Sequence, residues 1–325
     1  MAGPRTSSRA PVTVRVPEVA APNRPWSATA IEQFLGCPLR YWWQRIERWE
    51  TPSTAALVIG RAVHSALEHL LALPPEERLP ERADSYLADA LVAELALVEG
   101  QGIDEAEVRE GSARAMSSYW ATEEPARIEV ARDGLEREVR TDLVGLPFLG
   151  HIDRIAVAEP GLRVTDYKTG APKPKYWWSY WRQQLLYAAA LEDMGEPIAE
   201  IELLYLKEPR AVTRPVYPAA IRRALADLES AHEQREGMAT GGAWEARPGP
   251  LCRYCDFQPV CPAQRSGAPK PGTPESNAVL TERGLMQRGA DTTASGPVDK
   301  PPGDLIDILD DELLGNGVSD NGAGE

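Results

Sequence analysis

Acidic and basic side chains that could form a hydrolytic site occur in two short segments. The first contains Asp153, and the second contains Asp166 and Lys168. A β-strand projects residues i and i+2 to the same face, so Asp166 and Lys168 point together, and a neighbouring strand can bring Asp153 beside them. Crowded carboxylates repel each other unless a divalent cation such as Mg²⁺ lies between them. The pattern predicts a metal site where Lys168 orients or deprotonates an attacking water, or offsets the charge of a pentavalent transition state. The alternative is a surface strand end with an ordinary ion pair.

His64 is a candidate third ligand of this site. On a helix, Gly60, His64 and Leu67 share one stripe, so the imidazole faces inward among aliphatic side chains. A histidine in this position is either a core residue with satisfied hydrogen bonds or a metal ligand through a neutral ring nitrogen. Gly60, one turn earlier, favours the ligand because it lets another backbone or a ligand approach the helix closely.

A basic and aromatic stretch, residues 173–182, follows the proposed metal site. Aromatic faces stack on unpaired bases for roughly 1–3 kcal/mol each while Lys and Arg follow the phosphates, so the stretch suits single-stranded nucleic acid. Packing in a core is the alternative for Trp178 and Trp181. On the following helix, Gln183 and Tyr187 lie four residues apart and can both hydrogen-bond a bound strand. The predicted contacts are Lys173, Lys175, Tyr176, Trp177, Arg182, Gln183 and Tyr187.

All four cysteines fit a single centre. Cys252, Cys255 and Cys261 form a C-x2-C-x5-C loop, and Cys37 lies in a Gly-Cys-Pro sequence near the start of the chain. Four thiolates suit either tetrahedral zinc or a cubane iron–sulfur cluster, and spacing alone does not choose between them. Unrelated buried thiols are the third possibility. A shared centre would tie the first predicted helix to the end of the domain, which is a structural role.

The spacing of apolar residues predicts the elements that position these groups. Thr29 and Glu32 form a capping-box pattern that opens the first helix, which continues to Ile46. Further helices are expected at about 57–73, 81–99, 104–122, 177–193 and 218–235, and strands at 135–144, 146–157, 162–168 and 198–206. Short connections make the first three strands an antiparallel meander. The expected fold is an α/β core with an N-terminal helical lobe.

Composition divides the 325 residues into three regions. Residues 1–24 and 266–325 lack periodic apolar residues and are expected to be disordered, whereas 25–265 should form the ordered domain. Within the tail, residues 304–314 alternate acidic and aliphatic side chains, as either a fluctuating turn or a partner-docking motif would.

Charge and hydropathy exclude several classes of protein. The chain has 35 Lys+Arg and 49 Asp+Glu, and its net charge of -14 argues against a generic polyanion binder. Residues 266–325 hold 4 basic and 11 acidic residues, so half of the negative charge belongs to the tail. Four cysteines are too few for a disulfide scaffold, no apolar run approaches the roughly 18–20 residues of a membrane span, and the N-terminus lacks the apolar core of a signal peptide. We therefore expect a cytoplasmic protein with reduced thiols and no membrane partner.

Together these motifs resemble the PD-(D/E)XK nuclease superfamily, in its RecB-like exonuclease branch with an iron–sulfur cluster. The resemblance covers about residues 26–262. It rests on Gly36-Cys37-Pro38, Gly60-x-x-x-His64, Gly150-x-x-Asp153-Arg154, Asp166-Tyr167-Lys168-Thr169-Gly170, Gln183-x-x-x-Tyr187 and the C-x2-C-x5-C loop. It implies a restriction-endonuclease-like core, in which helices flank a central mixed sheet, with an N-terminal helical lobe and a C-terminal cysteine loop.

The resemblance also implies roles for single residues. It identifies His64, Asp153, Asp166 and the Tyr167 carbonyl as metal ligands, Lys168 as the catalytic lysine, Gln183 and Tyr187 as substrate contacts, and Cys37, Cys252, Cys255 and Cys261 as ligands of a 4Fe-4S cluster in preference to zinc. The proline that precedes the first aspartate in the superfamily is Ile152 here. An extra acid of the preceding strand would be Glu136 or Glu138, which the sequence does not distinguish.

The implied activity is that of a Mg²⁺- or Mn²⁺-dependent deoxyribonuclease, an exonuclease that degrades single strands or duplex ends in DNA repair, recombination or phage DNA processing. The alternatives are a catalytically silent iron–sulfur module that binds DNA or a partner, and a zinc-stabilised interaction protein. The sequence contains no Gly-x-x-x-x-Gly-Lys-Ser/Thr phosphate loop, so it has no recognisable ATP-driven motor. Such a nuclease would act alone or with a helicase or recombination partner supplied in trans.

Overall fold

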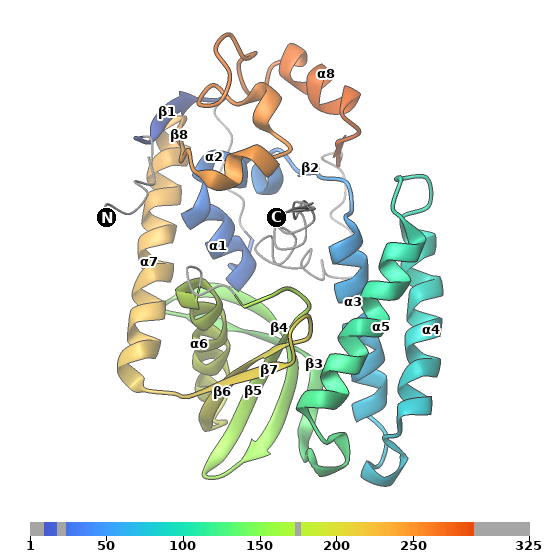
Figure 1. The fold of residues 1–325 in the computed structure, drawn as a ribbon. Coiled ribbons are helices and arrows are strands. Elements are labelled where there is room, and N and C mark those ends of the chain that lie inside the picture. Colours follow the sequence, from blue (N-terminus) through green and yellow to red (C-terminus); the bar gives the residue numbers. More distant parts are fainter. Residues whose placement is uncertain (1–9, 18–23, 173–176, 289–325) are drawn as a thin grey trace, which may run out of the picture.

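A five-stranded mixed sheet forms the centre of the computed structural model, which describes residues 10–17, 24–172 and 177–288 (Figure 1). In sheet order the strands are β3 (Val130–Leu143), β4 (Leu146–Ala158), β5 (Gly161–Lys168), β6 (Ile198–Tyr205) and β7 (Arg210–Pro215). β5 and β6 are parallel, and the other neighbours are antiparallel. The predicted α/β class and the antiparallel meander of the first three strands are confirmed.

Turn geometry explains why β3 and β4 form a hairpin. Val144 and Gly145 both have positive φ, 49° and 76°, and the two-residue turn that they form matches the twist of the paired strands. Strand β7 was not predicted. Its residues are almost all exposed, so it lacks the alternation of apolar and polar residues that marks a strand in sequence.

Helices cover both faces of the sheet (Figure 1). The helices are α3 (Ala55–Leu71), α4 (Pro80–Leu97) and α5 (Glu105–Thr122) in the N-terminal lobe, and α6 (Trp177–Asp193) and α7 (Pro218–Gly241) on the opposite side. Leu203 and Leu204 are consecutive on β6, and their side chains enter two different hydrophobic clusters, the first with α6 and the second with the lobe. Among the described helices, none has the length and the apolar composition needed to cross a membrane.

The segment from residue 28 to residue 46, predicted as one helix, is broken at Cys37. It consists of α1 (Ala28–Gly36), α2 (Pro38–Tyr41) and a π-helical turn (Trp42–Ile46). Cys37 is extended, with φ of -161°, because a residue before proline is disfavoured in the helical region. The predicted capping box is also wrong, since Ser27 is the N-cap and its hydroxyl accepts the Ala30 N–H at 3.2 Å.

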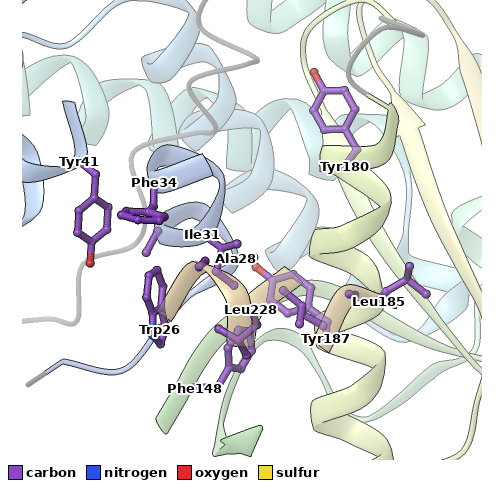
Figure 2. Packing of buried hydrophobic residues seen from close by; sticks show 14 of the residues in the cluster. Trp26, Ala28, Ile31, Phe34, Tyr41, Phe148, Tyr180, Leu185, Tyr187 and Leu228 are labelled. Atoms are coloured by element: carbon purple, nitrogen blue, oxygen red, sulfur yellow. The ribbon is translucent and has the colours of Figure 1, made fainter. Parts of the chain in front are cut away.

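Aromatic residues join α1 to the sheet. Figure 2 shows Trp26 and Phe34 in the cluster that also buries Phe148 of β4 and Tyr187 of α6. Trp26 also stacks on Tyr41, with ring centroids 6.0 Å apart. Cys37, after the end of α1, packs against this cluster together with Cys255 and Cys261 of the C-terminal loop.

Parts of the terminal segments are ordered, which corrects the prediction of disorder. The elements concerned are β1 (Val12–Arg15), α8 (Pro274–Glu282) and β9 (Met286–Gln287). β1 pairs with β8 (Ala243–Ala246), and β9 pairs with β2 (Trp49–Glu50). Val14 and Leu280 are buried against the domain, and such isolated apolar contacts leave no period in the sequence. The 304–314 motif lies outside the described residues.

Gln184 provides a test of stability within α6. Its side chain is fully buried, and in the described part of the chain neither amide atom has a hydrogen-bond partner. A buried unsatisfied polar group costs about 1–3 kcal/mol, so we expect Gln184→Leu to raise the free energy of unfolding by about 1–2 kcal/mol. Urea denaturation measures the change, and Gln234→Leu at an exposed position of α7 is the control. A lower denaturation midpoint for Gln184→Leu would contradict the prediction.

Candidate active site

Strands β4 and β5 separate at the candidate site. Their last ladder pair joins Arg154 to Thr165, whereas β5 and β6 stay paired as far as Lys168. Beyond this separation the Tyr167 N–H donates a 2.9 Å hydrogen bond to Oδ2 of Asp153. The Asp153 carboxylate therefore accepts the hydrogen bond of the Tyr167 N–H at a point where β4 and β5 are no longer paired. The two segments singled out in the sequence do meet.

His64 reaches the same place from α3. Its Nε2 lies 3.0 Å from the Tyr167 carbonyl oxygen, which can only accept, so Nε2 carries a proton and donates. Nδ1 then faces two carboxylates, Oδ2 of Asp153 at 3.5 Å and Oε1 of Glu136 at 3.8 Å. The imidazole is thus oriented by a backbone carbonyl on one side and presents its other nitrogen to the acids.

The donor atoms of His64, Glu136 and Asp153 all lie within 4.8 Å of one another. If the imidazole is neutral, its Nδ1 and the two carboxylate oxygens all present lone pairs to one another. Either a cation between these atoms or a second proton on the imidazole must then stabilise the group. Two carboxylates and one ring nitrogen suit Mg²⁺ or Mn²⁺. Burial by itself raises the pKa of Asp153, but His64, the Tyr167 N–H and Lys168 outweigh it and lower the pKa below its usual value, so the carboxylate is ionised at neutral pH.

An irregularity in β3 explains why Glu136, and not Glu138, joins this group of donor atoms. The β3–β4 register shifts between Val130 and Leu135, and Glu136 has a positive φ of 42°. Bulges of this kind redirect side chains. Glu138 instead lies 3.3 Å from Arg140 and 3.5 Å from His151.

These two glutamates form a matched pair for mutation. Glu136→Gln removes a charge from the donor group, so we expect the Mg²⁺ concentration for half-maximal activity to rise by about tenfold or more. Glu138→Gln makes the same chemical change two residues further along β3. It should alter the Mg²⁺ concentration for half-maximal activity by less than about twofold. Titration of the cleavage rate with Mg²⁺ measures both variants. Equal effects would contradict the selection of Glu136.

Asp166 and Lys168 form a buried ion pair beside this group. Lys168 Nζ lies 2.9 Å from Oδ2 of Asp166 and 5.0 Å from the centroid of the Tyr180 ring. The predicted shared face of the two side chains is borne out by this contact. Asp166 lies outside the group of three donors within 4.8 Å, which contains Glu136, and its role as a metal ligand stays a prediction.

The basic and aromatic stretch is divided by the structure. Lys173, Lys175 and Tyr176 lie outside the described residues. Arg182 is buried and forms ion pairs with Glu32 and Asp227, both at 2.6 Å. Its guanidinium fastens α6 to α1 and α7, which replaces the predicted contact with phosphate.

Other predicted substrate contacts also have partners within the protein. The Trp177 ring has the Arg214 guanidinium 5.6 Å from its centroid. Gln183 Nε2 donates to the Tyr187 hydroxyl at 3.3 Å, so these two side chains do share a face of α6, and both are buried. Gly150 makes room for Tyr187, because a Cβ at Gly150 would lie 2.6 Å from the ring. Their role in binding a substrate stays a prediction.

The four cysteines are free thiols on segments that pack together. Cys37 lies between α1 and α2, and the other three lie on or beside 3₁₀ turns at Pro250–Tyr254 and Gln258–Val260. Phe257, within the loop, stacks on Trp43 with ring centroids 4.9 Å apart. Burial raises the pKa of Cys255 to about 12, and Cys37 is close enough to contribute to the increase. Any centre that binds the Cys255 sulfur must therefore displace its proton.

Comparison with known proteins identifies the family of the chain. A family model of the PD-(D/E)XK nuclease superfamily matches residues 25–262. The chain belongs to this superfamily. The match spans the whole sheet, His64 and all four cysteines, and it makes the protein a nuclease.

Two solved structures resemble this PD-(D/E)XK nuclease at low identity. One is from Eubacterium rectale and is described as a "Putative exonuclease", with 16% identity, a TM-score of 0.49 and coverage of 71% of this chain and 88% of that chain. The other is described as SSO0001, with 13% identity, a TM-score of 0.30 and coverage of 67% of this chain and 89% of that chain. No curated protein matches the sequence.

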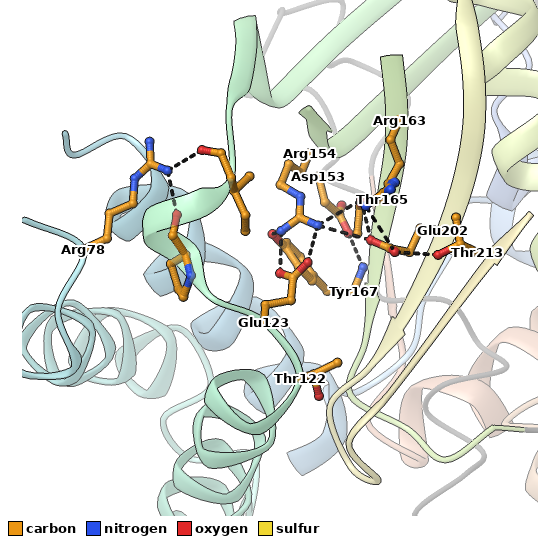
Figure 3. Close-up of polar contacts among 12 residues, drawn as sticks. Arg78, Thr122, Glu123, Asp153, Arg154, Arg163, Thr165, Tyr167, Glu202 and Thr213 are labelled. Atoms are coloured by element: carbon orange, nitrogen blue, oxygen red, sulfur yellow. Dashed lines mark hydrogen bonds and ion pairs between the residues drawn. The ribbon is translucent and has the colours of Figure 1, made fainter. Parts of the chain in front are cut away.

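A buried polar network behind the site was not predicted for this nuclease. Arg154, the residue after Asp153, lies between Glu123 and Glu202 and contacts the Tyr167 hydroxyl (Figure 3). Arg154 was visible in the sequence as part of the Gly-x-x-Asp-Arg motif. Its acidic partners come from the C-cap of α5 and from β6, and no sequence pattern links such distant residues.

Proposed function

We propose that this PD-(D/E)XK nuclease is a Mg²⁺- or Mn²⁺-dependent DNA exonuclease of the RecB-like branch that hydrolyses phosphodiester bonds in single strands or at duplex ends. The observation that carries the proposal is the convergence of His64, Glu136 and Asp153 beside the Asp166–Lys168 pair. Two acids and an imidazole this close together suit a cation, and an adjacent ammonium suits the negative charge of a reacting phosphate.

Each residue has a distinct part in this proposal. When bound, the divalent cation would polarise a phosphate oxygen and lower the pKa of a water molecule. His64, Glu136 and Asp153 would hold it, with the Tyr167 carbonyl keeping the imidazole in place. The Tyr167 N–H keeps the Asp153 carboxylate directed into the group.

Lys168 is assigned to charge stabilisation. Its ammonium lies 2.9 Å from a carboxylate oxygen of Asp166 and close to the Tyr180 ring, and both neighbours favour the charged form. A lysine that keeps its proton offsets negative charge that develops on the phosphate, and is a poor general base. Of the two roles that the sequence left open for Lys168, the contacts favour the electrostatic one.

For the cysteines we propose a 4Fe-4S cluster. The proposal rests on the resemblance to the iron–sulfur branch and on the packing of Cys37, Cys255 and Cys261 around one hydrophobic cluster. Cys37 and the loop at 252–261 are at opposite ends of the sequence of the domain, so the cluster would close the fold and take no part in hydrolysis.

Binding of DNA by the proposed exonuclease should depend on the cation. The net charge of -14 opposes a polyanion, and Arg182 is committed to internal ion pairs. We therefore infer modest affinity for DNA without metal. A role in repair, recombination or phage DNA processing, alone or with a helicase in trans, completes the proposal.

Time courses with 5′- and 3′-labelled single-stranded and duplex DNA, in Mg²⁺, in Mn²⁺ and in chelator, test the proposal. We expect cation-dependent release of short products from one labelled end. Internal cuts without end dependence would replace exonuclease by endonuclease. DNA binding with no product in either cation would favour the catalytically silent module.

A further inference from the structure

We propose that Arg154 is a positioning residue of the metal-binding group, and that it acts through Tyr167. The proposal rests on the function proposed above, because it gives a reason why His64 and Asp153 meet in the correct geometry. The Arg154 guanidinium contacts two buried carboxylates and the Tyr167 hydroxyl (Figure 3).

The Arg154 guanidinium is held on several sides. The side chain is 1% exposed, and it binds Glu123 through two hydrogen bonds of 2.6 and 2.7 Å. It also donates to Oε1 of Glu202 at 3.3 Å and to the Thr165 hydroxyl at 3.1 Å. Hydrogen bonds on several sides hold the planar guanidinium in one position. A side chain that hydrogen-bonds to it is therefore held in place as well.

Tyr167 connects this network to the donor group. Its hydroxyl accepts from Arg154 Nη1 at 3.2 Å, and the guanidinium carbon lies 5.5 Å from its ring centroid. The backbone of the same residue donates to Asp153 and accepts from His64. Fixing the Tyr167 side chain therefore fixes the peptide groups that orient two of the three donors.

The network also spans the boundary between the helical lobe and the sheet. Glu123 is the residue at which α5 ends, and Glu202 belongs to β6. His64 comes from α3, which packs on α5, whereas Asp153 comes from the sheet. Arg154 thus sets the distance between a donor of the lobe and a donor of the sheet.

Stability alone is a weak explanation for this arrangement. Buried ion networks give little net stabilisation because desolvation offsets the Coulombic gain. Glu202 has its own further contacts, with the Thr213 hydroxyl at 2.7 Å and with Arg163 at 3.7 Å, on the side of the network away from Tyr167. This side provides a matched control.

Tyr167→Phe and Thr213→Val test the proposal, because each removes one hydroxyl that hydrogen-bonds within this network, Tyr167 in its buried part and Thr213 at its exposed edge. Calorimetric titration with Mn²⁺ without DNA measures the affinity, and thermal denaturation measures the stability. We expect Tyr167→Phe to weaken Mn²⁺ binding by about tenfold, as outer-shell changes do, and Thr213→Val to leave it within about twofold. Arg154→Lys, which cannot form the two-point contact with Glu123, should resemble Tyr167→Phe.

Equal affinities of Tyr167→Phe and the wild type for Mn²⁺ would overturn the proposal, even if both hydroxyl variants lose the same stability. So would a wild-type protein that binds no Mn²⁺. If the wild type binds Mn²⁺ and Tyr167→Phe binds it more weakly, but neither cleaves DNA, the proposed function fails while the role of Arg154 stands. Should Arg154→Lys fail to fold, Tyr167→Phe still decides the matter.

Discussion

Asp153→Asn is expected to reduce the rate of DNA cleavage by about 10³-fold or more. The substitution removes the negative charge of the donor that lies 3.5 Å from Nδ1 of His64. The amide oxygen can still accept the Tyr167 N–H, so the local backbone should keep its conformation. Single-turnover cleavage of 5′-labelled DNA in saturating Mg²⁺ measures the loss.

Asp142→Asn is the control for this prediction. Asp142 is an exposed residue of β3, so its substitution makes the same change of net charge away from the donor group. We expect less than a twofold change in rate, because surface substitutions away from such features have small effects. If Asp153→Asn cleaves as fast as Asp142→Asn, hydrolysis occurs elsewhere on the molecule.

Cys255→Ser is expected to abolish the iron–sulfur centre and to lower the melting temperature by at least about 10 °C. The centre would connect Cys37 to the loop at 252–261, so its binding free energy contributes to the stability of the fold. Protein purified anaerobically should lose its visible absorbance, iron and sulfide together. Differential scanning calorimetry measures the change in stability.

Gln258→Ala, in the same loop but exposed, is the control for the cysteine variant. It should retain iron, sulfide and a melting temperature within about 2 °C of the wild type. Colourless wild-type protein that contains zinc would refute the cluster. In that case Cys255→Ser should still destabilise the protein, but through loss of zinc.

The sequence alone determined the parts that depend on local pattern. Period-two and period-3.6 spacing of apolar residues predicted the β3–β5 meander and helices such as α6, and the structure bears these predictions out. The i and i+2 rule predicted the contact between Asp166 and Lys168. Motif order also predicted that His64 and Asp153 belong together, although 89 residues separate them.

Only the tertiary structure decided the features that depend on contacts between residues far apart in the sequence. The bulge in β3 places Glu136, and not Glu138, in the donor group. The ion pairs of Arg182 with a glutamate and an aspartate give Arg182 a structural role. The order of the terminal segments and the pairing of Arg154 with Glu123 likewise follow from contacts across the fold. The physical reason is common to all of these. A side chain's direction, burial and ion pairing are set by neighbours that periodicity cannot reveal, because they lie far apart in the chain.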